Sequence, residues 1–151
     1  METFRITAKK HSGTLSASGK ANRWNKDGEN VLYVGSSRSL STLELVVHRS
    51  SIKPTIEYKV MIILLADDKN LYDEIHIKDL PTDWRKSSAY PELQKIGSNW
   101  YNSKRSLFLK VPSAVITQEF NYMVNLEHSG FSGANISLVR NEDYFWDDRL
   151  F

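Results

Sequence analysis

The chain has 151 residues, with 20 Lys and Arg against 18 Asp and Glu and a formal net charge of +2. Hydrophobic residues make up 40% and charged residues 25%, which is typical of a globular domain and excludes disordered and fibrous proteins. The absence of cysteine excludes a disulfide scaffold, a thiolate metal site and a cysteine nucleophile. Because domains usually contain about 100–200 residues, one domain spanning residues 1–151 is expected.

Charge and hydropathy also limit the partners. A net charge of +2 is too small to predict binding to nucleic acid through its phosphates. The longest apolar run, residues 60–66, is far shorter than the roughly 20 residues that cross a bilayer, and the first residues do not have a signal-peptide profile. A cytoplasmic protein without a membrane or nucleic-acid partner is therefore expected.

The first third of the chain alternates between strand and loop patterns. Residues 4–8 predict a strand, residues 9–19 a polar loop and residues 31–34 a short buried strand. Arg23 and Trp24 stand between the loop and the second strand.

Residues 39–49 predict a helix, because their apolar positions recur at spacings of three and four. At about 100° per residue, Glu44 falls some 40° from Leu40, at the margin of the apolar stripe. Two interpretations remain open. Glu44 either faces inward for a functional reason or caps its own helix in a capping box with Ser41.

The remainder predicts an α+β domain rich in strands. Residues 55–65 become continuously apolar, which favours a central strand covered on both faces. The other expected elements are a weak strand at 74–77, a helix at 91–100 and strands at 107–111, 122–124 and 136–139.

The common motifs of hydrolases, nucleotide-binding loops and zinc proteases are missing from the sequence. The four histidines are widely separated, so no metal is expected. Four polar or aromatic residues remain as candidates, although each alone has a structural interpretation as a surface cation, a core residue or a local cap. They are Arg23, Tyr33, Glu44 and Ser113.

In this order the candidates resemble the RES domain, which is named after its Arg, Glu and Ser. The similarity extends from Phe4-Arg5-Ile6 to the last residues. Its motifs are Asn22-Arg23-Trp24-Asn25, Val31-Leu32-Tyr33, Ser39-Leu40-Ser41-Thr42-Leu43-Glu44, Leu80-Pro81-Thr82-Asp83-Trp84, Ile96-Gly97-Ser98-Asn99-Trp100, Val111-Pro112-Ser113-Ala114-Val115, Asn121-Tyr122-Met123-Val124-Asn125 and Asp148-Arg149-Leu150. One departure is visible: the family usually has Gly-Gly before the Arg-Trp pair, where this chain has Ala21-Asn22.

The resemblance implies a compact α+β domain with a mixed central sheet flanked by helices, similar to ADP-ribosyltransferases. It also implies a toxin of a RES–Xre toxin–antitoxin module, with NAD as its substrate, no further cofactor and an Xre-type helix-turn-helix antitoxin as its partner, through which it can oligomerise. The catalytic residues would be Arg23, Glu44 and Ser113. The residues that bind NAD would be Arg5, Arg23, Tyr33 and Asn125.

Elementary chemistry is compatible with these roles. Nicotinamide leaves NAD as a neutral molecule, so a single carboxylate can suffice, whereas ordinary glycosidases need a second group to protonate the leaving oxygen. Glu44 would stabilise the cationic ribose, Arg23 and Arg5 would neutralise the pyrophosphate, and Tyr33 would pack on nicotinamide. Ser113 would hydrogen-bond the carboxamide or the ribose.

The sequence leaves several alternatives open. The acceptor of the ADP-ribosyl group can be water, phosphate or a side chain of a target protein. From another class, the chain can be a catalytically silent module that binds an antitoxin or a nucleotide, with Ala21-Asn22 as a sign of decay. Binding to nucleic acid is a third interpretation, favoured by the aromatic content and opposed by the balanced charge.

Overall fold

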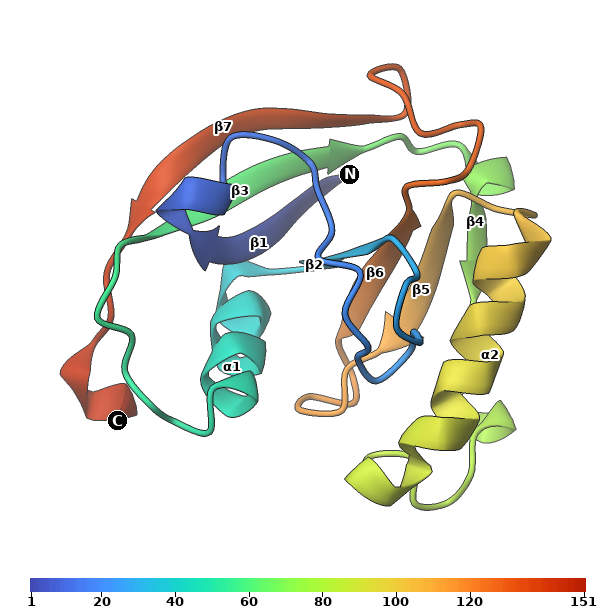
Figure 1. Cartoon of the computed structure of the whole chain (residues 1–151), viewed down its shortest axis with the longest axis horizontal. Coiled ribbons are helices and arrows are strands. Elements are labelled where there is room, and N and C mark those ends of the chain that lie inside the picture. Colours follow the sequence, from blue (N-terminus) through green and yellow to red (C-terminus); the bar gives the residue numbers. More distant parts are fainter.

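The computed structural model describes residues 1–151 and contains one seven-stranded sheet and two α-helices (Figure 1). The strands are β1 (Glu2–Ala8), β2 (Val31–Gly35), β3 (Tyr58–Leu65), β4 (Tyr72–Glu74), β5 (Phe108–Pro112), β6 (Phe120–Asn125) and β7 (Ile136–Tyr144). The helices are α1 (Arg38–His48) and α2 (Tyr90–Ser103). The sheet is mixed, because β4 and β5 are parallel and all other neighbours are antiparallel.

The sheet consists of two parts that are joined at a single point. Its strand order is β4-β5-β6-β2-β1-β3-β7, but β1 and β2 pair only through Phe4 and Gly35. In the view of Figure 1, strands β1, β3 and β7 run at a steep angle to β6, β5 and β4. Helix α1 follows β2 after two residues and so lies at the corner between the two parts.

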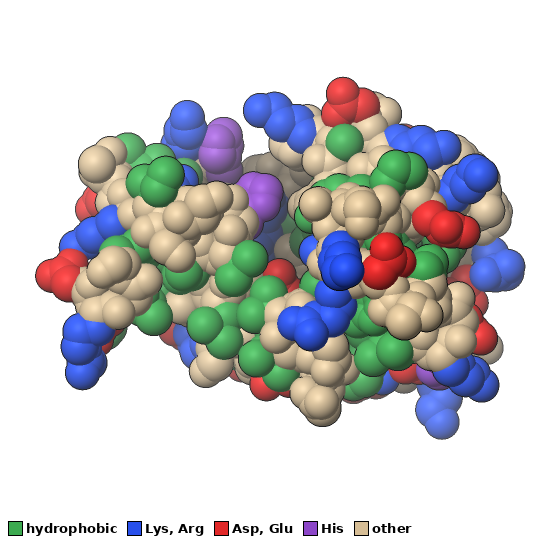
Figure 2. All heavy atoms as spheres, turned by 90° about the horizontal axis from the view of Figure 1, so that it is seen from below, with side chains coloured by type: hydrophobic (Ala, Val, Ile, Leu, Met, Phe, Trp, Pro, Cys, Tyr) green, Lys and Arg blue, Asp and Glu red, His purple; other side chains and the backbone are tan.

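The core fills the space between the two parts and behind α2. One cluster joins β2, β5 and β6 to β3 and β7, and its buried members are Leu32, Val34, Met61, Ile63, Leu65, Leu107, Phe108, Tyr122, Val124 and Ile136. A second cluster packs α2 on the other face of the four-stranded part, with Trp24, Val31, Trp84, Ala89, Leu93, Trp100, Leu109, Val111 and Met123. Seen from below, the surface of the molecule has a hollow between its left and right parts (Figure 2).

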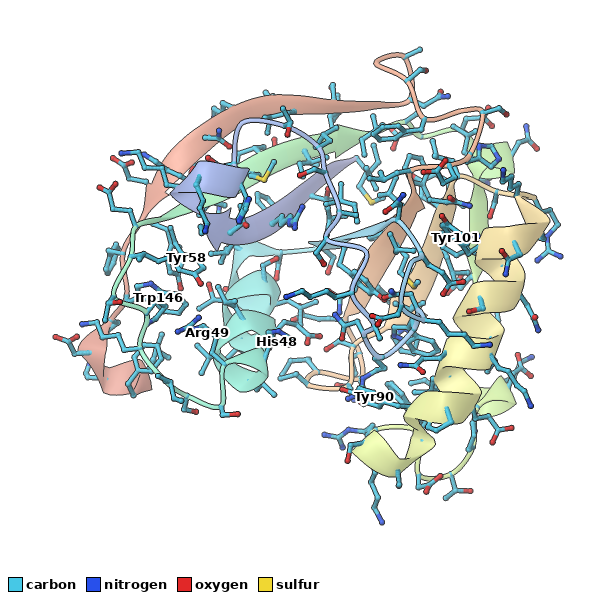
Figure 3. The ribbon with its side chains drawn as sticks, in the orientation of Figure 1. His48, Arg49, Tyr58, Tyr90, Tyr101 and Trp146 are labelled. Carbon is cyan, nitrogen blue, oxygen red and sulfur yellow. The ribbon has the colours of Figure 1, made fainter.

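The C-terminal residues form a small aromatic cluster away from this hollow. Trp146 packs edge-on against Tyr58 and Tyr144, with ring centroids 5.4 and 4.8 Å apart. Arg49 Nη1 donates to the Tyr58 hydroxyl at 3.3 Å, beside His48 at the end of α1 (Figure 3). The cluster therefore fixes the last residues to β3 and α1.

The predicted fold class, a single α+β domain with a mixed sheet flanked by helices, is confirmed. The predicted helix at 39–49 is α1, and the helix at 91–100 is the central part of α2. No helix of the chain is both long enough and apolar enough to span a membrane.

Two details of the predicted sheet are wrong. The apolar strand β3 is buried on both faces over residues 60–63, yet it lies next to the edge strand β7 and not at the centre. An apolar run reports what covers the faces of a strand, not how many strands lie beside it. The strand expected at 74–77 is β4 at Tyr72–Glu74, and a short 3₁₀ turn at Ile77–Asp79 follows.

Candidate active site

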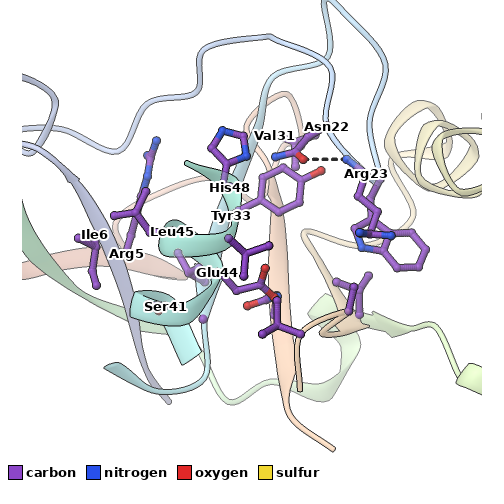
Figure 4. Close-up of a pocket in the computed structure, with 18 of the residues that line it drawn as sticks. Arg5, Ile6, Asn22, Arg23, Val31, Tyr33, Ser41, Glu44, Leu45 and His48 are labelled. Atoms are coloured by element: carbon purple, nitrogen blue, oxygen red, sulfur yellow. Dashed lines mark hydrogen bonds between the residues drawn. The ribbon is translucent and has the colours of Figure 1, made fainter. Parts of the chain in front are cut away.

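A cavity of about 360 Å³ lies at the corner where the two parts of the sheet meet. Its walls come from β1, β2, α1, the segment 18–24 and the ends of β5 and β6 (Figure 4). The polar and charged side chains that line it are Arg5, Ser18, Lys20, Asn22, Arg23, Tyr33, Ser41, Glu44, His48, Tyr90 and Asn121.

Glu44 points into this cavity from the middle of α1. The helix begins at Arg38, and its N-cap is Ser37, whose hydroxyl accepts from the backbone N–H of Leu40 at 3.0 Å. The Ser41 hydroxyl instead donates to the carbonyl of Phe4. The interpretation of Glu44 as a capping residue is therefore wrong.

Two neutral donors hold one oxygen of the Glu44 carboxylate. Oε1 accepts from Ser113 Oγ at 2.7 Å and from Asn121 Nδ2 at 2.8 Å. The second oxygen, Oε2, has no protein partner. No cation neutralises the carboxylate, because no Lys, Arg or His forms an ion pair with it. The charge of Glu44 thus remains available to a ligand.

Strand alternation explains why these donors meet Glu44. Val111 in β5 and Met123 in β6 face α2, so the residues two positions away, Ser113 and Asn121, belong to the same face. Asn121 pairs with Gly35 in β2. A Cβ at Gly35 would lie 2.4 Å from Ser41 Oγ, so a larger residue here would displace the hydroxyl that donates to the Phe4 carbonyl.

Ser113 stands behind Glu44 and does not line the cavity. It is fully buried, its single hydroxyl hydrogen goes to Glu44, and its oxygen accepts from the backbone N–H groups of Val115 and Ile116 at 3.0 Å. The predicted hydrogen bond from Ser113 to a ligand is therefore corrected: a hydroxyl carries one hydrogen, and this one orients the carboxylate.

Arg23 lies on the opposite wall of the cavity from Arg5 (Figure 4). Its Nη1 donates to the carbonyls of Trp84 and Arg85 at 2.9 and 3.1 Å, and its guanidinium lies 4.8 Å from the ring centroid of Tyr90. These contacts fix the guanidinium while Nε and Nη2 keep their hydrogens for a ligand.

The turn that carries Arg23 is well fixed despite the departure at Ala21-Asn22. Asn22 Oδ1 accepts from the backbone N–H of Arg23 at 2.8 Å, and the Asn22 carbonyl accepts from Gln94 Nε2. Neither Ala21 nor Asn22 has a positive φ, so glycine is not required at these positions. The departure does not disturb the turn.

Tyr33 presents its ring to the cavity, and its hydroxyl donates to Asn25 Oδ1 at 2.6 Å. Burial raises the pKa of the Tyr33 hydroxyl, which keeps it protonated as a donor. Arg5 lines the other wall and donates from Nη1 to the Ser16 carbonyl at 2.8 Å. Burial lowers the pKa of the Arg5 guanidinium, because no carboxylate compensates its desolvation.

Asn125 is not part of the cavity. It is fully buried, its Nδ2 donates to the Tyr101 carbonyl at 2.9 Å, and its Oδ1 accepts from the backbone N–H of Glu127. The prediction that Asn125 binds a ligand is therefore corrected. The polar atoms of its side chain are already hydrogen-bonded within the protein, and the bond to Tyr101 joins the end of β6 to α2.

Sequence reasoning assigned no role to several residues that line the cavity, among them Lys20, His48, Tyr90 and Asn121. His48 has a local signal, since it follows Glu44 by four residues and so shares its face of the helix. The other three come from distant segments and have no such signal. No cluster of three or more His, Asp or Glu side chains is placed to hold a metal ion.

The cavity combines one carboxylate with several cations that have no acidic partner. Such cations suit an anionic ligand, and the carboxylate suits an atom of that ligand that becomes positively charged during a reaction. Arg5, Lys20 and Arg23 line the cavity without an ion pair, whereas surface cations such as Arg38 and Arg105 pair with carboxylates.

Known proteins are similar to this chain in sequence and in fold. The RES domain family matches residues 2–147. A protein named Toxin Res from Yersinia enterocolitica is 33% identical over 128 residues, which are 85% of this chain and 82% of that protein. A second Toxin Res, from Photorhabdus laumondii, is 31% identical over 99% of this chain and 97% of its own length.

Two further proteins extend the comparison. The Prs ADP-ribosylating toxin of a Sphingobium species is 31% identical over 85% of this chain and 79% of that protein. A chain of the M. tuberculosis MbcT–MbcA toxin–antitoxin complex shares the fold with a TM-score of 0.76 at 17% identity, over 95% of this chain and 83% of that one. The chain therefore belongs to the RES domain family, the family of the curated Res toxins.

Proposed function

We propose that the protein is a toxin enzyme that cleaves the bond between nicotinamide and ribose in NAD. The observation that carries this proposal is the Glu44 carboxylate, which is held through Oε1 alone in a cavity where the cations Arg5, Lys20 and Arg23 have no acidic partner. A dinucleotide matches this distribution, because its pyrophosphate is anionic and its reacting ribose becomes cationic.

The reaction assigns one task to each residue. As the C1′–N bond breaks, its electron pair leaves with neutral nicotinamide, and the ribose becomes oxocarbenium-like. Glu44 Oε2 stabilises this positive charge, Arg23 and Arg5 bind the pyrophosphate, and the Tyr33 ring packs against nicotinamide. Water or inorganic phosphate then attacks C1′ and loses a proton to solvent.

A second candidate is transfer of the ADP-ribosyl group to a protein. The relative from Sphingobium is named as a toxin that ADP-ribosylates Prs, and this supports a protein acceptor for the same site. The two candidates share the breaking of the glycosidic bond and differ only in what attacks C1′ afterwards.

An antitoxin partner belongs to the same proposal. The solved structure with the same fold is a toxin–antitoxin complex, which supports an antitoxin as the protein partner of this chain. We expect an Xre-type antitoxin, assembly in the cytoplasm and a single RES domain over residues 1–151, with NAD as substrate and no further cofactor.

The direct test is nicotinamide release from NAD by the purified protein, with and without phosphate. Release establishes cleavage, and dependence on phosphate separates phosphorolysis from hydrolysis. If the folded protein releases no nicotinamide alone but modifies a target protein, the second candidate replaces the first. Tight NAD binding without either reaction would leave a silent binding module.

Asn121 supplies a test of how Glu44 is held. In Asn121→Ala, Oε1 loses one of its two donors, and kcat for nicotinamide release should fall about tenfold, the equivalent of roughly 1.4 kcal/mol. The KM for NAD should change little, because Asn121 acts through Glu44. Asn102→Ala, an exposed residue of α2, is the matched control. A rise in KM with an unchanged kcat would instead make Asn121 a substrate contact.

A further inference from the structure

A groove adjoins the central cavity on the side of Arg23. It has a volume of about 500 Å³ and is lined by the end of α1, the segment 82–86 and the turn after β5. The residues common to the groove and the cavity are Arg23, Val47, Ala114 and Val115. Arg23 therefore stands between them.

The groove is positively charged. Arg23, Arg85 and Lys86 line it against the single acid Asp83. Arg85 Nε donates to the Ala114 carbonyl at 2.8 Å, which anchors the side chain and leaves both terminal nitrogens without a partner. Neither Arg85 nor Lys86 forms an ion pair. Two anchored guanidinium groups with an unpaired Lys beside them suit a phosphate-bearing ligand.

The groove also has an apolar wall. Val47 is 58% exposed although it lies on α1, and Ala114 and Val115 lie across from the loop that carries Arg85. Small apolar side chains beside a guanidinium plane are suited to a flat aromatic base, on which arginine stacks. The groove thus offers contacts for a base as well as for phosphate.

We propose that this groove binds the adenylate half of NAD, with the pyrophosphate at Arg23 and the nicotinamide ribose at Glu44. The assignment rests on the proposed function and adds the direction in which the dinucleotide lies. On the opposite side, Arg5 and Lys20 also lack an acidic partner, and Arg5 donates to the Ser16 carbonyl. The Arg23 side adds a continuous path with an apolar wall and two further cations, Arg85 and Lys86, that form no ion pair.

Ligand binding to a catalytically inactive variant tests the direction in which the dinucleotide lies, because no turnover interferes. Lys86→Glu and Arg85→Gln are each introduced into the Glu44→Gln variant. Calorimetry then gives the dissociation constants of NAD, AMP and nicotinamide mononucleotide for each protein. Each charge change should weaken NAD and AMP about tenfold, the effect of losing one charge-assisted contact, and leave nicotinamide mononucleotide within about twofold. Lys95→Glu, an exposed cation of α2 outside both cavities, is the matched control.

The outcomes separate this proposal from the proposed function. If all three ligands weaken equally, or none does, the adenylate half lies elsewhere. If Lys20→Glu on the opposite wall weakens AMP instead, the dinucleotide runs the other way. Both results leave nicotinamide release by the wild-type protein intact, whereas failure of the wild-type protein to act on NAD overturns the proposed function itself.

Discussion

Glu44→Gln should abolish nicotinamide release while leaving the fold and NAD binding intact. The amide oxygen of glutamine can accept from Ser113 and Asn121 as Oε1 does, so the side chain keeps its position. What is lost is the negative charge at Oε2, which faces the cationic ribose. Removal of a preorganised electrostatic contact typically costs about 10²–10³-fold in kcat, and a loss of this size is expected.

The same substitution has a consequence in cells. Expression of the wild-type chain without a partner should arrest growth, and expression of Glu44→Gln should not. The control is Glu92→Gln, an exposed acid in the first turn of α2, which should remain as toxic as the wild type. Wild-type turnover by purified Glu44→Gln would show that the carboxylate charge is not part of catalysis.

Gly97→Ala should destabilise the protein by about 2–3 kcal/mol, within the usual range for overpacked cores. A Cβ at this position would lie 1.6 Å from the Trp24 carbonyl oxygen, which is backbone and cannot rotate away. The sign of the stability change is diagnostic, because the same substitution in an exposed helix would raise the stability by about 1 kcal/mol. Chemical denaturation measures the difference.

Activity should fall together with stability in this variant, because the carbonyl displaced by the Cβ belongs to the residue next to Arg23. The matched control is Gly133→Ala, where a Cβ would meet nothing within 4 Å. A Gly97→Ala protein as stable as the wild type would mean that α2 can move away from the Arg23 turn without cost. The position of the turn would then not depend on Gly97.

Local patterns were sufficient to locate the helices and most strands, and they placed Glu44 at the margin of the apolar stripe without deciding between an inward position and a cap. The spacing of apolar residues determines which face of a helix is buried, and this depends only on neighbours in the sequence. Strand order depends on pairing between distant segments. The apolar run at 60–65 therefore predicted burial of β3 correctly and its place at the centre of the sheet wrongly.

The same distinction holds for the site. Arg5, Arg23, Tyr33 and Glu44 line one cavity, as the resemblance to the RES domain implied. The hydrogen bonds of Ser113, the engagement of Asn125 with Tyr101, and the presence of Asn121 beside Glu44 required the tertiary structure. Asn121 and Asn125 lie four residues apart on β6, and no local pattern distinguishes them.

The sequence by itself determined the fold class, the family and the candidate site residues, because these depend on periodicity and on the order of motifs along the chain. Only the tertiary structure decided which of those residues share the cavity. The reason is that β1 and β2 meet only at Phe4 and Gly35, so the corner that creates the cavity exists only once the sheet has formed.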